Sequence, residues 1–127
     1  MKNILIDTGI LINFLRGDMK AKEFLSNLAD DGTVYCSAIT IAEIFAGMIE
    51  NERKQTEELI DSLNIINVNK EIAEKAGSYK NRIKTQNLEL DDCIIAATAF
   101  YKQAKLATGN GKHYSMTDIA KIIVSST

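Results

Sequence analysis

The chain has 127 residues, which is the size of one domain, and we expect a single domain over residues 1–127. Hydrophobic residues make up 46% and charged residues 25%, a globular balance that excludes an intrinsically disordered chain. The formal charge of −2 argues against a protein that binds nucleic acid by charge alone. No apolar run approaches a membrane span, and Asp7 comes too early for a signal peptide, so we expect a soluble cytoplasmic protein.

The two cysteines, Cys36 and Cys93, lie in apolar strings, which favours buried thiols over a disulfide. Together with His113, the one histidine, they show no zinc-ligand spacing. A Ser/His/Asp or Cys/His nucleophilic site would need His113, and the sequence offers it no obvious partner. These residues therefore argue against a zinc site and against a catalytic triad.

Short apolar runs that are typical of buried strands alternate with helical patterns along the chain. We expect strands at residues 3–6, 33–36, 65–68, 106–108 and 122–124, and helices at residues 10–15, 21–28, 41–48, 59–63, 72–83 and 93–101. Gly17 is a helix stop, and Asp18 is expected to cap the next helix. The alternation predicts an α/β fold with a central parallel sheet and helices on both faces. In such sheets ligands bind beyond the carboxyl ends of the strands.

Two acidic residues lie at the ends of predicted elements on this edge of the sheet. For each of them a helix-capping role is the alternative to a functional role. Asp7 ends the first strand, where it either faces a ligand crevice or caps the following helix. Glu43 fits a capping box with Thr40 as the N-cap, an explanation that is local and complete. No other charge occurs in that helix before Glu50, which favours a functional role instead.

Three further polar residues belong to the same edge. Asp92 shares a helix face with inward-facing apolar residues, whereas Asp91 is better suited to capping the helix. Asn110 follows the strand at 106–108 between two glycines, so it is first a turn residue, although its amide oxygen can also bind a hard cation.

Taken together, Asp7, Glu43, Asp92 and Asn110 are expected at one edge of the sheet. Three carboxylates at close range repel each other, and Mg²⁺ or Mn²⁺ relieves that repulsion because both ions prefer oxygen ligands. Such a site suits metal-dependent cleavage of a phosphodiester bond. The basic side chains of the predicted helices and of the segments that follow them are mostly typical of a solvated surface. Some of them are available to contact a phosphate backbone.

Several segments resemble motifs of the PIN-domain ribonucleases, and most closely those of VapC-type toxins. The segments are Ile4-Leu5-Ile6-Asp7-Thr8-Gly9, Leu15-Arg16-Gly17-Asp18, Ser37-Ala38-Ile39-Thr40-Ile41-Ala42-Glu43-Ile44, Asp92-Cys93-Ile94-Ile95-Ala96-Ala97-Thr98-Ala99 and Leu106-Ala107-Thr108-Gly109-Asn110. The Asp92 segment is the most specific of them. The resemblance covers nearly the whole chain.

The resemblance implies a PIN-like fold and a Mg²⁺- or Mn²⁺-dependent endoribonuclease. In that family Asp7, Glu43 and Asp92 would be the acidic metal ligands, and Asn110 would occupy a fourth catalytic position. Thr8 and Thr108 would support the ligands or face the substrate. A homodimer and a cognate antitoxin that blocks the site are also implied.

The sequence departs from the family's pattern at three positions. Pro is common where Asp91 stands, Arg is common at Gly109, and Asp is common near His113. A neutral Asn110 makes the fourth ligand weaker, although the three acids are unaffected.

Two other functions remain open. One is a non-catalytic RNA- or protein-binding module on the same fold. The other is a phosphatase with an aspartate nucleophile, which Asp7-Thr8-Gly9 fits poorly because it lacks a second acid two residues on.

A possible partner surface is indicated by an excess of apolar residues in two helices. The residues are Phe14, Leu15, Phe45, Met48 and Ile49. They are either core residues or, where exposed, part of a groove for a second subunit or an antitoxin helix.

Overall fold

The computed structural model describes residues 2–28, 32–84 and 88–125 of the chain. Within these residues, parallel strands form a sheet in the order β3-β2-β1-β4-β5. The strands are β1 (Lys2–Ile6), β2 (Gly32–Ser37), β3 (Asn64–Ile66), β4 (Lys105–Thr108) and β5 (Lys121–Ile123). This confirms the predicted central parallel sheet.

Helices connect the strands, as the alternating pattern predicted. They are α1 (Thr8–Leu15), α2 (Met19–Leu28), α3 (Ala38–Gly47), α4 (Arg53–Asp61), α5 (Lys70–Arg82) and α6 (Leu90–Lys102), with 3₁₀ turns η1 (Glu50–Glu52) and η2 (Gly111–His113). Gly17 has a φ of 86° between α1 and α2, a conformation that favours glycine. Asp18 accepts a hydrogen bond from the backbone N of Ala21 at 2.9 Å, which confirms it as the cap of α2.

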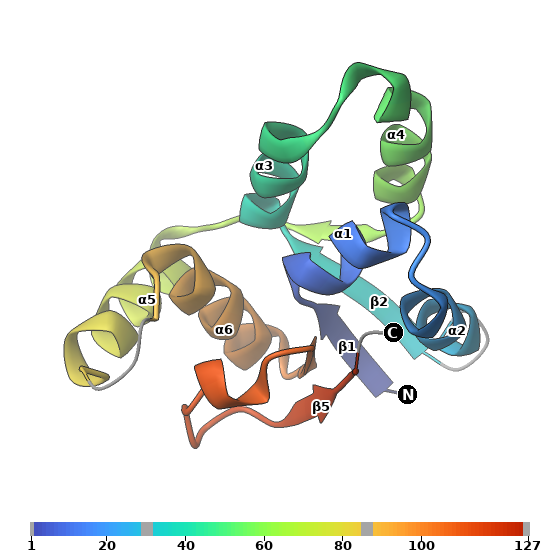
Figure 1. The fold of residues 1–127 in the computed structure, drawn as a ribbon. Coiled ribbons are helices and arrows are strands. Elements are labelled where there is room, and N and C mark those ends of the chain that lie inside the picture. The colour runs from blue at the N-terminus through green and yellow to red at the C-terminus, as the bar shows by residue number, and fades with distance from the viewer. Residues whose placement is uncertain (1, 29–31, 85–87, 126–127) are drawn as a thin grey trace.

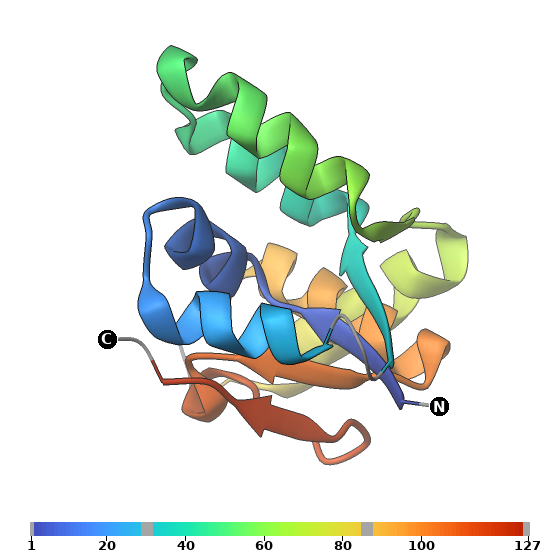
Figure 2. The same cartoon turned by 90° about the vertical axis from the view of Figure 1, so that its right-hand side faces the viewer.

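Helices cover both faces of the sheet (Figures 1 and 2). Leu5 of β1 and Leu106 of β4 pack against α5 and α6, whereas their neighbours Ile6 and Ala107 point to the opposite face, toward α1 and α2. This alternation follows from the period of two along a strand. The helix α6 is buried almost all round, as predicted, and Cys36 and Cys93 are buried free thiols.

The helices α3 and α4 form a pair that projects from the body of the molecule (Figures 1 and 2). Of the apolar residues singled out in the sequence, Ile49 at the tip of this pair is 59% exposed, whereas Phe45 and Met48 are partly buried. Phe14 and Leu15, in the last turn of α1, are partly buried and pack against the core on that face of the sheet. The expected partner surface is therefore only partly exposed.

The strand order places a topological switch at the centre of the sheet. From β1 the chain adds β2 and then β3 on one side, and later returns to add β4 and β5 on the other side. The crevice beyond the carboxyl ends of β1 and β4 is where such sheets bind ligands. Asp7 directly follows β1, and Thr108 is the last residue of β4.

Among the helices that the structure describes, none is both long enough and apolar enough to cross a bilayer.

Candidate functional site

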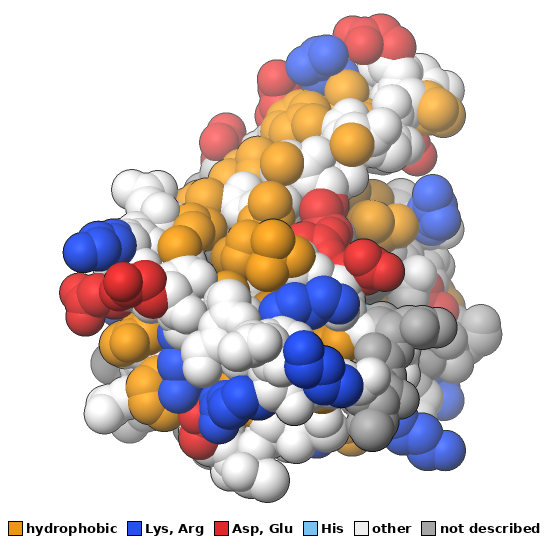
Figure 3. Space-filling view, turned by 90° about the vertical axis from the view of Figure 1, so that its left-hand side faces the viewer, with side chains coloured by type: hydrophobic (Ala, Val, Ile, Leu, Met, Phe, Trp, Pro, Cys, Tyr) orange, Lys and Arg blue, Asp and Glu red, His pale blue; other side chains and the backbone are white. Residues whose placement is uncertain are grey.

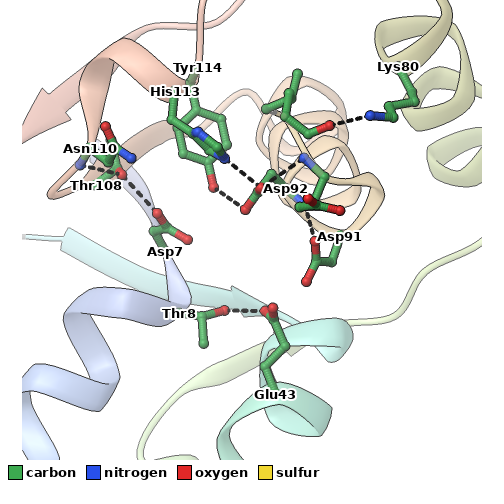
Figure 4. Close-up of polar contacts among 12 residues, drawn as sticks. Asp7, Thr8, Glu43, Lys80, Asp91, Asp92, Thr108, Asn110, His113 and Tyr114 are labelled. Atoms are coloured by element: carbon green, nitrogen blue, oxygen red, sulfur yellow. Dashed lines mark hydrogen bonds and ion pairs between the residues drawn. The ribbon is translucent and has the colours of Figure 1, made fainter. Parts of the chain in front are cut away.

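Asp7 lies at the switch point, where β1 gives way to α1. Its backbone N donates to the carbonyl of Ala107 at 2.9 Å, which extends the pairing of β1 with β4 by one residue. The side chain of Asp7 accepts a hydrogen bond from the Thr108 hydroxyl at 2.8 Å and makes no capping hydrogen bond to α1. Asp7 thus stands at the N-cap position, but its carboxylate is turned to the crevice (Figure 4).

Glu43 lies across the crevice from Asp7, on α3. The Thr8 hydroxyl is 2.6 Å from Glu43 Oε1, to which it donates, and 2.9 Å from the hydroxyl of Thr40. Asp7 and Thr8 are consecutive residues. The same backbone turn therefore carries one carboxylate of the crevice, Asp7, and the hydroxyl that donates to a second carboxylate, Glu43.

The capping box expected at Thr40 and Glu43 is wrong. The helix begins earlier, at Ala38, because Ser37 is the N-cap and accepts a hydrogen bond from the backbone N of Ile39 at 3.2 Å. Thr40 is therefore inside the helix and fully buried. Ser37 and Thr40 are both good cap-forming residues, and no local pattern favours the first over the second.

Asp92 projects from the first turn of α6. Its Oδ2 accepts from the backbone N of Glu89 at 3.2 Å and lies 2.7 Å from His113 Nε2, while its Oδ1 lies 3.4 Å from the Tyr114 hydroxyl. Asp92 thus reaches back to the start of the helix, so Asp91 is not alone in bonding to the backbone N–H groups at this helix end, as the sequence had suggested.

Asp91 instead adds a fourth carboxylate to the crevice. Its Oδ1 accepts from the backbone N of Asp92 at 3.0 Å, and its side chain is turned toward Glu43 (Figure 4). A hydrogen bond between Asp91 and Glu43 contributes to the raised pKa of Glu43. The residue that is Pro in the resembling motif is therefore an acid in contact with the site.

His113 and Tyr114 also belong to the site, and the sequence did not predict this. His113 was expected to have no partner, yet it contacts Asp92, 21 positions earlier in the sequence. Tyr114 is fully buried next to it. The signals in the sequence were their position shortly after Asn110, beyond the carboxyl end of a strand, and the resemblance to a family in which Asp is common near His113.

Asn110 acts mainly through its backbone. Its N donates to the Thr108 hydroxyl at 3.1 Å, and its carbonyl accepts from the backbone N of His113 at 3.1 Å. Its side chain is exposed and makes no hydrogen bond within the described part of the chain. Asn110 is therefore a turn residue, as predicted, and it lies at the rim of the acidic cluster (Figure 4).

Burial and like charge make the crevice costly for carboxylates. Burial raises the pKa of Asp7, and the charge of Asp92 raises it further, against the hydrogen bonds from Thr108 and Tyr114. Burial, the hydrogen bond with Asp91 and the charges of Asp91 and Asp92 raise the pKa of Glu43 to about 7, although Thr8 opposes this. Burial and the charges of Asp7 and Asp92 raise the pKa of Tyr114, so its phenol stays protonated as a donor.

The donor chemistry of this cluster fits a hard divalent cation. Four carboxylates face one crevice, and their mutual repulsion is the condition that a cation relieves. Within residues 2–28, 32–84 and 88–125, no three His, Cys, Asp or Glu side chains already stand close enough to hold one ion. The protein's own hydroxyl and imidazole groups hold the carboxylates in their present positions.

The basic residues play varied roles around the crevice. Lys80 donates to the carbonyl of Leu88 at 2.6 Å, and Lys75 pairs with Asp118 at 2.8 Å, so both have structural partners. Lys84 lies beyond the end of α5 and is exposed. Figure 3 shows acidic side chains at the base of the projecting helical pair, with Lys and Arg side chains beneath them.

Comparisons with known proteins agree with this arrangement. A protein named ribonuclease VapC10, from Mycobacterium tuberculosis, is 33% identical over 120 residues, which cover 93% of this chain and 90% of that protein. A solved toxin–antitoxin complex from Klebsiella pneumoniae contains a chain with 29% identity and a TM-score of 0.79, and the match covers 92% of this chain and 95% of that one.

A further structure, VapBC2 from Rickettsia felis bound to a DNA fragment from its promoter, matches with a TM-score of 0.83. That match covers 97% of this chain and 99% of the other at 19% identity, so it shows the fold alone. The sequence model of the PIN-domain family matches residues 4–119 of this chain. Since this match spans most of the sequence and includes every acidic residue of the crevice, the chain belongs to the PIN-domain family.

Proposed function

We propose that this protein is a metal-dependent endoribonuclease and the toxin of a toxin–antitoxin pair. The observation that carries the proposal is the convergence of Asp7, Glu43 and Asp92 at the switch point of the sheet, in a PIN-domain chain 33% identical to a named ribonuclease. The intact carboxylates favour this function over a non-catalytic binding module. A phosphatase lacks support, since Gly9 stands where its second acid would be.

In this proposal Asp7, Glu43 and Asp92 hold Mg²⁺ or Mn²⁺, and the amide oxygen of Asn110 is available as a fourth ligand. When bound, such an ion activates water and neutralises phosphate charge during in-line displacement. Thr108 orients the carboxylate of Asp7 through its hydroxyl.

The neighbouring hydroxyl groups fix the remaining ligands. Thr8 holds Glu43 at 2.6 Å, and Thr40 supports Thr8 from inside α3. Tyr114, with its raised pKa, remains a neutral hydrogen-bond donor between Asp7 and Asp92. The site is thereby preorganised without an additional positive charge that would compete with the ion.

The substrate that fits this crevice is single-stranded or looped RNA, because its backbone and bases are accessible without opening a duplex. Exposed basic residues such as Lys84 and Lys112 are available for phosphate groups at the rim. With a net charge of −2, the protein depends partly on the ion for phosphate affinity, so binding should show a modest salt dependence. A cytoplasmic location is proposed from this substrate.

A cognate antitoxin and a second copy of the chain are proposed as partners. A chain in the Klebsiella pneumoniae toxin–antitoxin complex resembles this one over nearly its whole length. A groove of about 430 Å³ between the α1–α2 corner and α4 includes Phe14, Leu15 and Leu59 in its lining. We propose that an apolar segment of the antitoxin occupies this groove.

Replacing Asp92 or Asp7 with Asn should reduce RNA cleavage by about 100-fold or more, because each variant loses an anionic oxygen ligand while keeping its shape. The measurement is cleavage of a mixed RNA pool with Mn²⁺, with chelator as a blank. Asp61→Asn, on the exposed end of α4, is the matched control and should retain activity. Full activity in both crevice variants would refute the proposed site.

The metal-free protein should lose stability as pH rises from about 4.5 to about 7. Glu43 has a raised pKa in the folded state, so folded protein keeps a proton that unfolded chain has already released in this window. Thermal unfolding in chelator should therefore show a lower Tm at pH 8 than at pH 5. The Glu43→Gln variant should show a smaller difference and a higher Tm at pH 8. Identical pH profiles for the two proteins would contradict this origin.

Filling the groove should separate antitoxin binding from catalysis. Gln55 is exposed on α4 and lines the groove, so Gln55→Trp should weaken antitoxin binding at least about tenfold, equal to about 1.4 kcal/mol. Binding is measured by titrating purified antitoxin. Lys54→Trp, on the adjacent exposed position outside that lining, is the control. Equal affinities for the two variants would place the antitoxin elsewhere, and cleavage should be unchanged in both.

A further inference from the structure

His113 is the only histidine in the chain, and the structure places it against the acidic crevice. Its Nε2 lies 2.7 Å from Asp92 Oδ2 (Figure 4). The side chains of His113 and Asp92 are 23% and 20% exposed, so neither is sealed in the core. An ion entering from solvent can therefore reach both.

The spacing of the two atoms is that of neighbouring ligands on one ion. Adjacent ligands of an octahedral ion, with bonds of about 2.1 Å, lie about 3 Å apart. The Nε2–Oδ2 separation of 2.7 Å is close to that value. A neutral imidazole with its proton on Nδ1 presents the Nε2 lone pair toward the same region as the carboxylate.

The turn that carries His113 is held firmly. Lys121 of β5 donates to the carbonyl of Gly111 at 3.3 Å and also to the carbonyl of Tyr114. Gly111 packs directly against the side chain of Ile123 in β5, which adds a second contact between the turn and this strand. Since Tyr114 is fully buried, the backbone on both sides of His113 is fixed.

We propose that His113 Nε2 is a nitrogen ligand beside Asp92, and that it makes the site favour first-row transition ions such as Mn²⁺ and Co²⁺ over Mg²⁺. This inference rests on the proposed metal-dependent function and adds a ligand that the family resemblance did not include. Imidazole binds transition ions well, whereas Mg²⁺ prefers oxygen and parts reluctantly with its water. The alternative is that His113 only orients Asp92 through a hydrogen bond.

The direct test is pulsed electron paramagnetic resonance of the Mn²⁺-loaded protein, prepared without a histidine tag and without RNA. The expected spectrum shows ¹⁴N coupling of the imidazole type, which can come only from His113. In His113→Gln the coupling should disappear, although the amide N–H can still hydrogen-bond to Asp92. Tyr114→Phe keeps His113 and should retain the coupling.

Metal affinity gives a second readout. In His113→Gln the Kd for Co²⁺ and Mn²⁺, measured by calorimetry, should rise at least about tenfold, with a smaller change for Mg²⁺. Mn²⁺ bound without nitrogen coupling in the wild-type protein would overturn the ligand role and leave the proposed nuclease intact. Failure of the wild-type protein to bind Mn²⁺ at all would overturn both. Because the wild-type spectrum is decisive, a variant that fails to fold does not affect the test.

Discussion

The repulsion among four carboxylates in one crevice is the constraint on which the rest of this site depends. Asp7, Glu43, Asp91 and Asp92 come from three separate elements and meet beyond the carboxyl ends of the central strands. Burial makes their charges expensive, as the raised pKa values of Asp7 and Glu43 show. A folded protein keeps such a cluster only with compensation, and here neutral donors supply part of it.

The need for hydrogen-bond donors explains why threonine and tyrosine side chains surround the carboxylates. Thr8 begins α1 and Thr108 ends β4; both are buried, and each donates to a carboxylate of the crevice. Tyr114 adds a phenol that burial keeps protonated. These groups lower the free energy of burying the carboxylates but do not neutralise their charge. The remaining negative charge favours binding of a cation. The parallel sheet brings residues more than 100 positions apart to within 2.8 Å, as Thr108 and Asp7 show.

The sequence was sufficient to predict the sheet, its helical layers and three of the acidic residues, because these depend on local patterns. Apolar runs mark β1 and β4, and Asp7 directly follows the first of these. Helix starts were harder, since Ser37 and Thr40 are equally good caps by local chemistry. In the structure Ser37 is the cap, and the hydroxyl of Thr40 is hydrogen-bonded to Thr8 instead.

The tertiary contacts were beyond the reach of sequence patterns. The contact of His113 with Asp92 joins residues 21 positions apart, with a strand between them. Periodicity distinguished Asp92 from Asp91, but the approach of Asp91 to Glu43 depends on how α6 packs beside α3. Such details depend on how elements pack, and they are also the details that adapt one fold to a particular chemistry.

The most direct test of this account is anomalous scattering from crystals of the protein grown without RNA and soaked in Mn²⁺. We expect an anomalous peak in the crevice, next to the carboxylates of Asp7 and Asp92. The peak should disappear in the Asp92→Asn variant. A fully soaked crystal with no peak in the crevice would contradict the claim that these carboxylates form a cation site.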